Sequence, residues 1–299
     1  MQKFIFFIIL LIFANSIIIA QNEEDTIRVD SSIVVLNATI TDQSGKIVNG
    51  LKQTQFKIFE DGKEQTIESF SAEQTPFAAV ILLDTSGSML QRISLARSAA
   101  INFLDGLRVD DNAAIYNFDS KVALVQDFSN NRDIAEKIFD LEAYGMTVLN
   151  DAIYEAAIAL SKRTEKRKAI VVLSDGADTK SKYSADKALK AVIAAGATIY
   201  TVDMSPIDMN GRERMQSQSV LKNFAEKSGG KFIPVAGGIA LRTAFTEIVS
   251  ELGAQYTITY SPTNTVKDGK YRAIEIRVSK PNLTIRTRKG YNAPKAKKR

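Results

Sequence analysis

Apolar and polar positions along the chain follow two different periods, which change near Pro76 and again near Gly253. Before Pro76 and after Gly253, apolar and polar residues alternate with a period of two, which is typical of half-buried β-strands. Between these points, short continuous apolar runs alternate with stretches in which apolar residues recur every three to four positions. This order of buried strands and amphipathic helices predicts a parallel sheet built from βα units.

The central region opens with the apolar run Ala79 to Leu83, which ends directly at Asp84 and predicts a fully buried strand. Further strands are predicted at 169–174, 197–202 and 231–235. Helical patterns cover 93–107, 131–139, 149–162, 184–195, 216–228 and 239–252. A predicted hairpin supplies one antiparallel edge strand to the sheet, from residues 113–118 and 121–126.

The two flanking regions carry the period of two. Residues 33–41 alternate cleanly, and residues 55–60 and 64–70 are predicted to form a hairpin around the turn signal EDGK. After Gly253, three more strands are predicted near 256–260, 274–278 and 283–288. Neither flank can bury its apolar face alone, so we expect the two to meet in one sandwich. The predicted fold class is α/β, with a doubly wound, mostly parallel sheet inserted in a small β-sandwich formed by the N- and C-terminal segments.

The first twenty residues combine an early Lys3, an apolar run from Phe4 to Ala14 and a small residue at Ala20. This pattern is typical of a secretory signal cleaved after Ala20, with an uncleaved N-terminal anchor as the alternative. The run is shorter than the ~20 residues of a membrane-spanning helix, which favours cleavage. We therefore predict an exported protein, periplasmic or extracellular, with no transmembrane segment after cleavage. The predicted parts are a signal peptide (1–20), an N-terminal β segment (21–75), the central domain (76–253), a C-terminal β segment that pairs with the N-terminal one (254–292) and a basic tail (293–299).

The chain contains neither Cys nor His. The absence of Cys excludes disulfides, and the absence of His excludes Ser-His-Asp triads and His-based zinc sites. Because most of the usual catalytic groups are missing, we predict that the protein is not an enzyme. Eight basic residues and no acid lie between Lys280 and Arg299, within a net charge of +5. No aromatic-interleaved nucleic-acid motif accompanies them, so a solvated strand and tail are favoured over a nucleic-acid surface.

The loop after the first central strand, DTSGSM, concentrates oxygen-bearing side chains at Asp84, Ser86 and Ser88. Gly87 supplies the backbone freedom of a tight turn, so the three side chains can converge on one point. Hard divalent cations bind such oxygen ligands. Asp and Ser at these places also serve as turn residues or helix caps, which is the alternative interpretation.

DTSGSM resembles the Asp-x-Ser-x-Ser element of the metal-ion-dependent adhesion site in von Willebrand factor type A domains. The other two parts of that site occur in the same order, with Thr147 before a helical pattern and Asp175 after a buried strand. The order of strands and helices over 76–253 also resembles a complete type A domain. This resemblance implies a site for Mg²⁺, or for Mn²⁺ or Ca²⁺, that consists of Asp84, Ser86, Ser88, Thr147 and Asp175. It implies that the hydroxyls contact the metal directly and that one or both carboxylates act through water.

The resemblance further implies a metal-dependent, adhesion-type module that captures an acidic side chain of a protein partner. Neutral hydroxyl ligands leave most of the cation's charge uncompensated, and an open coordination position then attracts an outside carboxylate. Two alternatives stay open: a structural envelope protein with a vestigial metal site, and a metal-assisted hydrolase. Five residues near the site in sequence are weighed as supporting groups, although such residues are more often caps or turn residues: Asp119, Asp151, Ser174, Gly176 and Asp178.

The whole mature chain carries a second resemblance, to the VWFA-related domain proteins common in Acidobacteria, which covers nearly all of residues 27–294. It is carried by NATITDQSG, FKIFEDGKEQ, QYTITYSPTN and RKGYNAP. It implies the architecture of the whole chain, and it names no partner because a fold does not determine one.

Overall fold

The computed structural model describes residues 33–130, 135–206, 209–234 and 237–296. The described residues form one compact unit, in which the strands make one six-stranded and two four-stranded sheets. The predicted signal peptide lies outside the described residues, as do Lys297 to Arg299 of the predicted basic tail.

The six-stranded sheet has the order β10-β9-β8-β5-β6-β7. Its strands are β5 (Phe77–Asp84), β6 (Asn112–Phe118), β7 (Val122–Ser129), β8 (Arg167–Ser174), β9 (Ala197–Asp203) and β10 (Phe232–Pro234). Every pairing is parallel except that between β6 and β7, which is antiparallel at one edge. All eight residues of β5 are buried. A strand that is covered on both faces needs apolar side chains at successive positions, as β5 has before its final Asp84.

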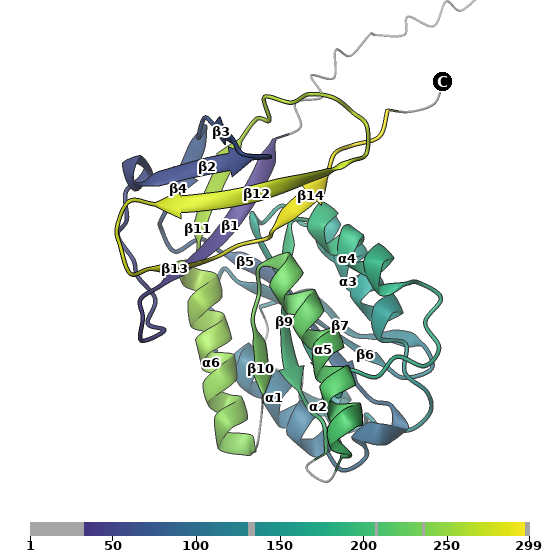
Figure 1. Ribbon diagram of the computed structural model, residues 1–299. Coiled ribbons are helices and arrows are strands. Elements are labelled where there is room, and N and C mark those ends of the chain that lie inside the picture. The colour runs from purple at the N-terminus through teal and green to yellow at the C-terminus, as the bar shows by residue number, and fades with distance from the viewer. Residues whose placement is uncertain (1–32, 131–134, 207–208, 235–236, 297–299) are drawn as a thin grey trace, which may run out of the picture. The chain divides into compact units, whose positions relative to one another are not determined.

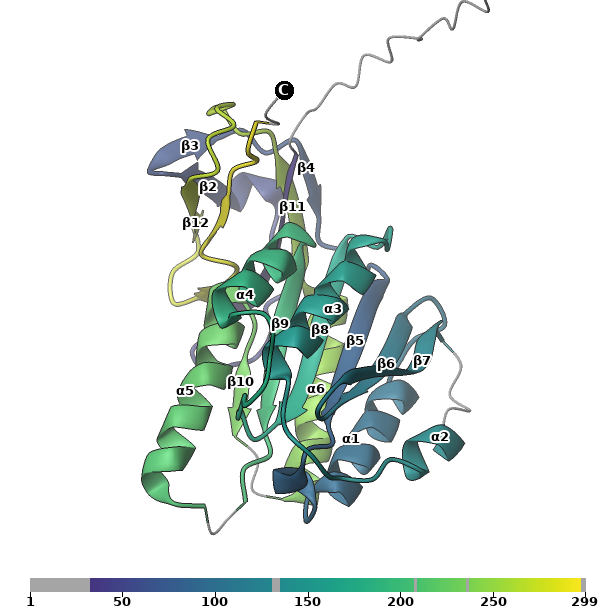
Figure 2. The same ribbon diagram turned by 90° about the vertical axis from the view of Figure 1, so that its right-hand side faces the viewer.

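Helices cover both faces of this sheet (Figures 1 and 2). They are α1 (Ile93–Asp105), α2 (Ala135–Phe139), α3 (Leu149–Ser161), α4 (Ala185–Ala194), α5 (Gly211–Ser228) and α6 (Gly238–Ala254). Alternate side chains of β5 point to opposite faces, so Ile81 packs in one core with α1 and α6, and Leu82 packs in another with α3, α4 and α5. The predicted doubly wound, mostly parallel sheet is confirmed.

The two four-stranded sheets form a β-sandwich with orders β13-β1-β11-β4 and β14-β12-β2-β3. Its strands are β1 (Val34–Thr41), β2 (Phe56–Glu60), β3 (Lys63–Gln65), β4 (Ser69–Ser71), β11 (Tyr256–Tyr260), β12 (Tyr271–Val278), β13 (Thr284–Arg286) and β14 (Gly290–Asn292). Each sheet joins the two ends of the chain, because β1 pairs with β11 and β2 pairs with β12. Leu36, Ile58 and Ile258 meet in the core between the sheets. The predicted insertion of the α/β domain in a sandwich is thus present.

Two predicted elements differ from the structure. The strand predicted at 64–70 is two strands, since β3 pairs with β2 in one sheet and β4 pairs with β11 in the other. A period of two continues through such a crossing, so it does not reveal the change of sheet. Helix α5 begins at Gly211, five residues before the predicted start, because the Asn210 side chain accepts a hydrogen bond from the Arg212 backbone N–H at 2.9 Å and caps it.

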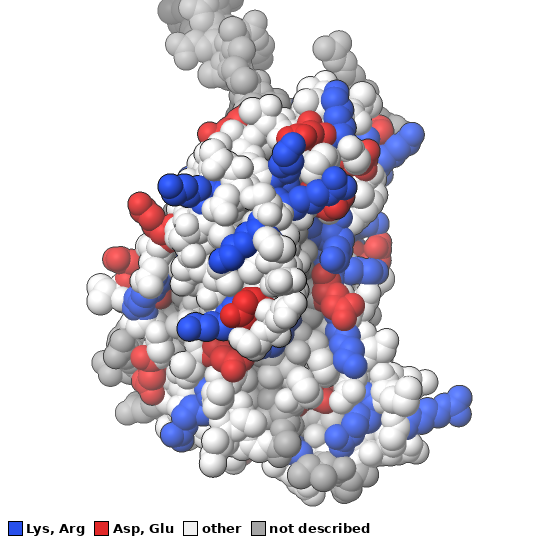
Figure 3. All heavy atoms as spheres, turned by 60° about the vertical axis from the view of Figure 1, so that its left-hand side comes forward, with Lys and Arg blue, Asp and Glu red and all other residues white. Residues whose placement is uncertain are grey.

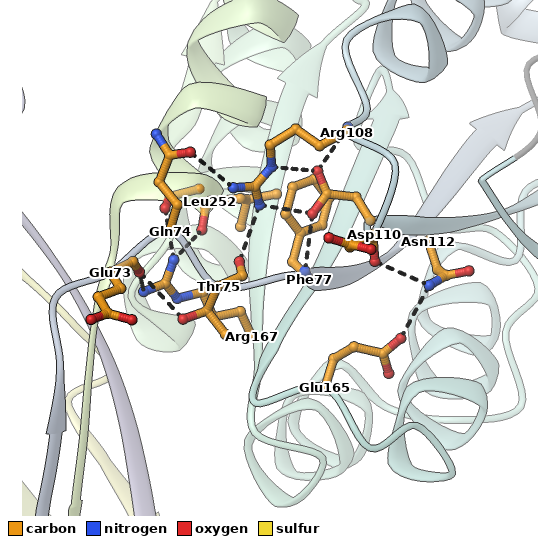
Figure 4. A network of polar contacts seen from close by, with 12 residues as sticks. Glu73, Gln74, Thr75, Phe77, Arg108, Asp110, Asn112, Glu165, Arg167 and Leu252 are labelled. Atoms are coloured by element: carbon orange, nitrogen blue, oxygen red, sulfur yellow. Dashed lines mark hydrogen bonds and ion pairs between the residues drawn. The ribbon is translucent and has the colours of Figure 1, made fainter.

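Arg167 at the start of β8 ties the α/β domain to the sandwich (Figure 4). Its side chain is 0% exposed and donates to the carbonyl of Glu73 at 2.8 Å, on the segment that leads into the domain. It also donates to the carbonyls of Leu252, Gly253 and Gln255, on the segment that leads out, and to the Thr257 hydroxyl of β11. One guanidinium therefore holds both connections between the domains at the amino edge of the sheet.

The carboxyl ends of the parallel strands lie at the opposite edge of the sheet, away from the sandwich (Figures 1 and 2). Helices α5 and α6 both begin at this edge. In open α/β sheets, ligands bind in the crevice outside the carboxyl ends of the strands. The candidate residues Asp84 and Asp175 lie at this free edge.

Candidate functional site

The two candidate carboxylates come from neighbouring strands. Asp84 is the last residue of β5, and Asp175 directly follows β8, whose Leu173 pairs with Leu83. Both carboxylates are almost completely buried. The hydroxyl of Ser174 donates to Asp84 Oδ2 at 2.5 Å and so joins the two strand ends. Parallel pairing alone brings these two acids to one place.

The loop after Asp84 folds back on that carboxylate. The Ser86 backbone N–H donates to Asp84 Oδ1 at 2.9 Å, which is a contact within three residues of chain. The hydroxyl oxygens of Ser86 and Ser88 lie 3.1 Å apart, with Ser86 buried and Ser88 exposed. The three predicted side chains of this loop therefore converge, and the Ser88 end of the group reaches the surface.

Thr147 reaches the site through the loop that precedes α3. The Tyr144 N–H donates to the Thr85 carbonyl at 2.9 Å, and the Gly87 N–H donates to the Gly145 carbonyl at 3.2 Å. Gly145 has a φ of +84°, and a Cβ at this position would lie 2.7 Å from the Ser120 hydroxyl oxygen. Only glycine fits this docked conformation without strain, and it sets Thr147 beside the Ser86 loop.

A third loop, which follows Asp175, closes the other side of Thr147. The Thr179 N–H donates to the Thr147 carbonyl at 2.9 Å, and the Thr147 N–H donates to the Thr179 hydroxyl at 2.9 Å. The Ala177 N–H donates to Asp175 Oδ1 at 3.0 Å. The structure thus gathers the three segments that carry the five predicted residues into one hydrogen-bonded cluster at the sheet edge.

The electrostatics of this cluster suit a cation. Burial raises the pKa of Asp84 to about 7, the nearby charge of Asp175 adds to the rise, and hydrogen bonds from Ser174 and Ser86 oppose it. Asp175 Oδ2 is buried and has no hydrogen-bond partner among the described residues. A buried carboxylate oxygen without a donor is costly, and a bound cation would satisfy it. Carboxylate and hydroxyl oxygens are also the donor set that Mg²⁺ accepts, so these residues fit the expected ion.

The described residues contain no group of three or more Asp, Glu, His or Cys side chains that could hold a metal ion. A metal at this edge would therefore depend on the hydroxyls of Ser86, Ser88 and Thr147 as well as on two carboxylates. Such a site is invisible to a search for acidic clusters alone.

The acids weighed as supporting groups organise the loops. Asp151 accepts hydrogen bonds from the Lys182 and Tyr183 N–H groups, and Asp178 accepts from those of Asn150 and Ser181. Together they fasten the loop after Asp175 to the first turn of α3, which begins just after Thr147. Asp119 accepts from the Lys121 N–H in the turn between β6 and β7.

Sequence reasoning gave no role to three residues that shape the site: Gly145, Ser120 and Thr179. Their only local signal is a glycine two positions before Thr147. Their contacts join segments far apart in the chain, so no local pattern identifies them. Ser174 was weighed for its position beside Asp175, and the hydrogen bond from its hydroxyl to Asp84 joins the ends of β5 and β8.

These features define a class of domain: a doubly wound α/β sheet whose loops collect hydroxyl and carboxylate oxygens at the carboxyl edge. Residues 79–177 match the family described as the von Willebrand factor type A domain. The chain therefore contains a von Willebrand factor type A domain, within the α/β domain described above. The sequence matches no curated protein.

Solved structures with a similar fold include the vWF domain of the type V pili tip protein Mfa5 from Porphyromonas gingivalis. It is 15% identical over 60% of this chain and 95% of that chain, with a TM-score of 0.50. A von Willebrand factor type A protein from Catenulispora acidiphila is 14% identical over 89% of this chain and 75% of that chain, also with a TM-score of 0.50. The PilB minor pilin from Streptococcus sanguinis is 15% identical over 62% of this chain, with a TM-score of 0.49. The match covers 63% of the length of that pilin. At these identities the likeness concerns the fold.

Two further observations bear on surroundings and partners. Within the described ranges, no helix has both the length and the apolar character needed to cross a membrane. On the face shown in Figure 3, Lys and Arg side chains are interspersed with Asp and Glu.

Proposed function

We propose that this chain is an exported, divalent-cation-dependent protein-binding module of the adhesion type, which acts in the periplasm or outside the cell. The residues that would hold Mg²⁺, or Mn²⁺ or Ca²⁺, are Asp84, Ser86, Ser88, Thr147 and Asp175. When bound, the cation supplies a coordination position that a carboxylate of a protein partner can fill.

The observation that carries this proposal is the convergence of three loops at one open edge of the sheet. Asp84 and Asp175 are buried and linked through Ser174, while Ser88 lies at the surface. The buried acids hold the charge and orient the hydroxyls, and the exposed hydroxyl leaves a path from solvent. This arrangement suits capture of an outside group better than a closed structural site, in which protein ligands occupy every position.

The fold adds a reason to favour adhesion over catalysis. The type A domain of the pilus tip protein Mfa5 shares this fold, and the place of that protein at a pilus tip motivates a binding role here. The chain contains no His and no Cys, so the usual general base and thiol nucleophile are absent from its sequence. We therefore infer that this chain binds a protein partner and does not catalyse a reaction.

Thermal unfolding in the presence of each metal tests the metal part of the proposal. A ligand that binds only the folded state stabilises it by RT ln(1 + [L]/Kd), or about 2.7 kcal/mol at a hundredfold excess over Kd. We expect Mg²⁺ or Mn²⁺ to raise the Tm of residues 21–299, and Asp84→Ala to remove that rise. Ser88→Ala should weaken the rise without disturbing the core, because Ser88 is exposed.

Asp186→Ala is the matched control, because Asp186 is an exposed acid in the first turn of α4. This variant should keep the full metal-induced rise in Tm. Melting curves that coincide in metal and in chelator for the unaltered protein would refute the site. Capture of proteins from envelope extract, run with Mg²⁺ and with chelator, tests the binding part: capture that chelator leaves unchanged would show that binding does not use the metal.

A further inference from the structure

Large apolar side chains gather at the surface around the candidate metal site. Three of them lie on the loops that carry Ser88 and Thr147, and we call these three the apolar rim: Leu90, Tyr144 and Met146. Their exposed fractions are 66%, 64% and 52%. Two more exposed apolar residues are Met215, in the second turn of α5, and Ile239, in the first turn of α6, and both helices begin at the same edge (Figure 1). Single exposed apolar residues are ordinary, but several beside one open site indicate an interaction surface.

Backbone hydrogen bonds bring the two loops of the rim together. The Leu90 N–H donates to the Gly87 carbonyl at 3.3 Å, and the Gly87 N–H donates to the Gly145 carbonyl at 3.2 Å. Tyr144 and Met146 are the two neighbours of Gly145 in the chain. The contact between Gly87 and Gly145 therefore lies between the three side chains, in the same loops that present the Ser88 and Thr147 hydroxyls.

The backbone under the rim is held in place. The Met146 N–H donates to the Ser120 hydroxyl at 3.1 Å, and the Tyr144 N–H donates to the Thr85 carbonyl at 2.9 Å. Gly145 between them packs closely on Ser120. A surface whose backbone is already ordered loses less conformational entropy on binding than a loose loop does. Exposed apolar side chains on such a backbone suit contact with a partner.

Exposed side chains of both signs lie on the loops of this edge. Lys180 is exposed, and its backbone N–H donates to the Thr147 carbonyl at 3.1 Å, so it directly adjoins the site. Lys121, also exposed, follows Ser120, which holds the rim loop. The acids Glu142, on the rim loop, and Asp178 are exposed as well, and the carboxylate of Asp178 accepts two backbone N–H groups. These side chains balance in charge, so the attraction for an outside carboxylate would come from the bound cation.

We propose that the apolar rim selects the partner: it binds a protein segment in which the metal-directed carboxylate is flanked by bulky apolar side chains. This inference rests on the proposed function, because the carboxylate is placed by the cation. The carboxylate then positions the segment on the cation, and burial of the flanking side chains against Leu90, Tyr144 and Met146 supplies the binding affinity.

Three matched synthetic peptides test the inference. The first has a central Glu flanked by Leu and Phe, the second has the same Glu flanked by Ser, and the third has Gln in place of Glu between the apolar flanks. Each is immobilised, and the protein is titrated over it with Mg²⁺ and again with chelator. We expect Mg²⁺-dependent binding of the first peptide to be about tenfold tighter than that of the second, with no Mg²⁺-dependent binding of the third.

The variant that tests the rim combines Leu90→Ser, Tyr144→Ser and Met146→Ser. It should fold, because all three side chains are exposed and their contacts described above use the backbone. It should keep the Mg²⁺-induced rise in Tm and lose the preference for apolar flanks. The control combines Val109→Ser and Val266→Ser, which are 80% and 61% exposed and lie outside the site loops. The control should keep the preference.

The outcomes separate this inference from the proposed function. Mg²⁺-dependent binding of both Glu peptides with equal affinity overturns the inference alone, and so does a preference that survives the triple substitution. Equal binding of the Gln and Glu peptides shows nonspecific apolar adhesion and also overturns it. If no Glu peptide binds in a Mg²⁺-dependent way, capture of carboxylates is wrong, and the inference falls with it.

Discussion

Replacement of Arg167 by Met would show how firmly the sandwich is joined to the type A domain. Met has a similar length and fills much of the space, but it donates no hydrogen bond. The change leaves four backbone carbonyls and one hydroxyl without the donor that they have in the structure: Glu73, Leu252, Gly253, Gln255 and Thr257. Four of these five hydrogen bonds are buried, and the bond to Glu73 is partly accessible to water.

The expected loss follows from the cost of buried acceptors. Each buried polar group left unsatisfied costs about 1–3 kcal/mol, and neighbouring losses are not additive. The opposing effect is the desolvation of the guanidinium, which lowers the pKa of Arg167 to about 10 and which Met relieves. Because the carbonyls stay in place while their donor is gone, we expect the hydrogen-bond loss to dominate. The net destabilisation should be about 3 kcal/mol, a large part of the ~5–15 kcal/mol that stabilises a typical domain.

Urea unfolding followed by circular dichroism and by tyrosine fluorescence measures this loss. With a slope near 2–3 kcal/mol/M, a loss of about 3 kcal/mol lowers the midpoint by roughly 1–1.5 M. In the unaltered protein both probes should report one transition, because Arg167 binds both connections between the domains. In Arg167→Met the transitions should separate as the domains lose their common anchor.

Arg242→Met is the matched control, since Arg242 is exposed on α6. Its midpoint should equal that of the unaltered protein. If Arg167→Met and Arg242→Met have the same midpoint, relief of desolvation cancels the lost hydrogen bonds. The account of Arg167 as the anchor of both connections would then be refuted.

Two further predictions concern the site and three buried tyrosines. Gly176→Ala should destabilise the fold by about 1–3 kcal/mol and reduce the metal-induced rise in Tm, because Gly176 has a φ of +84° and its Cβ would lie 2.5 Å from the Ser217 carbonyl oxygen. Gly211→Ala, with no atom within 4 Å of the added Cβ, should leave both quantities unchanged, and equal metal responses in the two variants would contradict this account. Burial raises the pKa of Tyr200, Tyr260 and Tyr291 above the ordinary 10.0, with Glu251 acting on Tyr200 and Glu60 on the other two. The contribution of these tyrosines to the free energy of unfolding is therefore complete below pH 10 and declines as the pH rises above it. An ultraviolet absorbance titration should show them ionising only when the protein unfolds. Ionisation of all nine tyrosines of the chain near pH 10 in the folded protein would contradict the prediction.

Local sequence was sufficient wherever the decisive interactions are local. The apolar run of β5 requires a strand buried on both faces, and the turn after it is closed by a bond from the Ser86 N–H to Asp84, two residues away. The alternating flanks likewise predicted a shared sandwich, because neither could bury its apolar face alone. Thr147 and Asp175 were identified as partners of that turn through the family resemblance, because no local pattern points to them. Their role as metal ligands stays a prediction.

Tertiary structure decided what depends on contacts between distant segments. The pairing of Val34 with Tyr260 sets the sandwich register, and a period of two is compatible with several registers. Arg167 is a charged residue at a strand start, and only the two connections folded around it make it fully buried. Tyr144 and Met146 are apolar residues that a hydrophobic pattern would place in a core. They are exposed because the contact of Gly145 with Gly87 holds their loop at the surface, beside the edge where a partner can reach them.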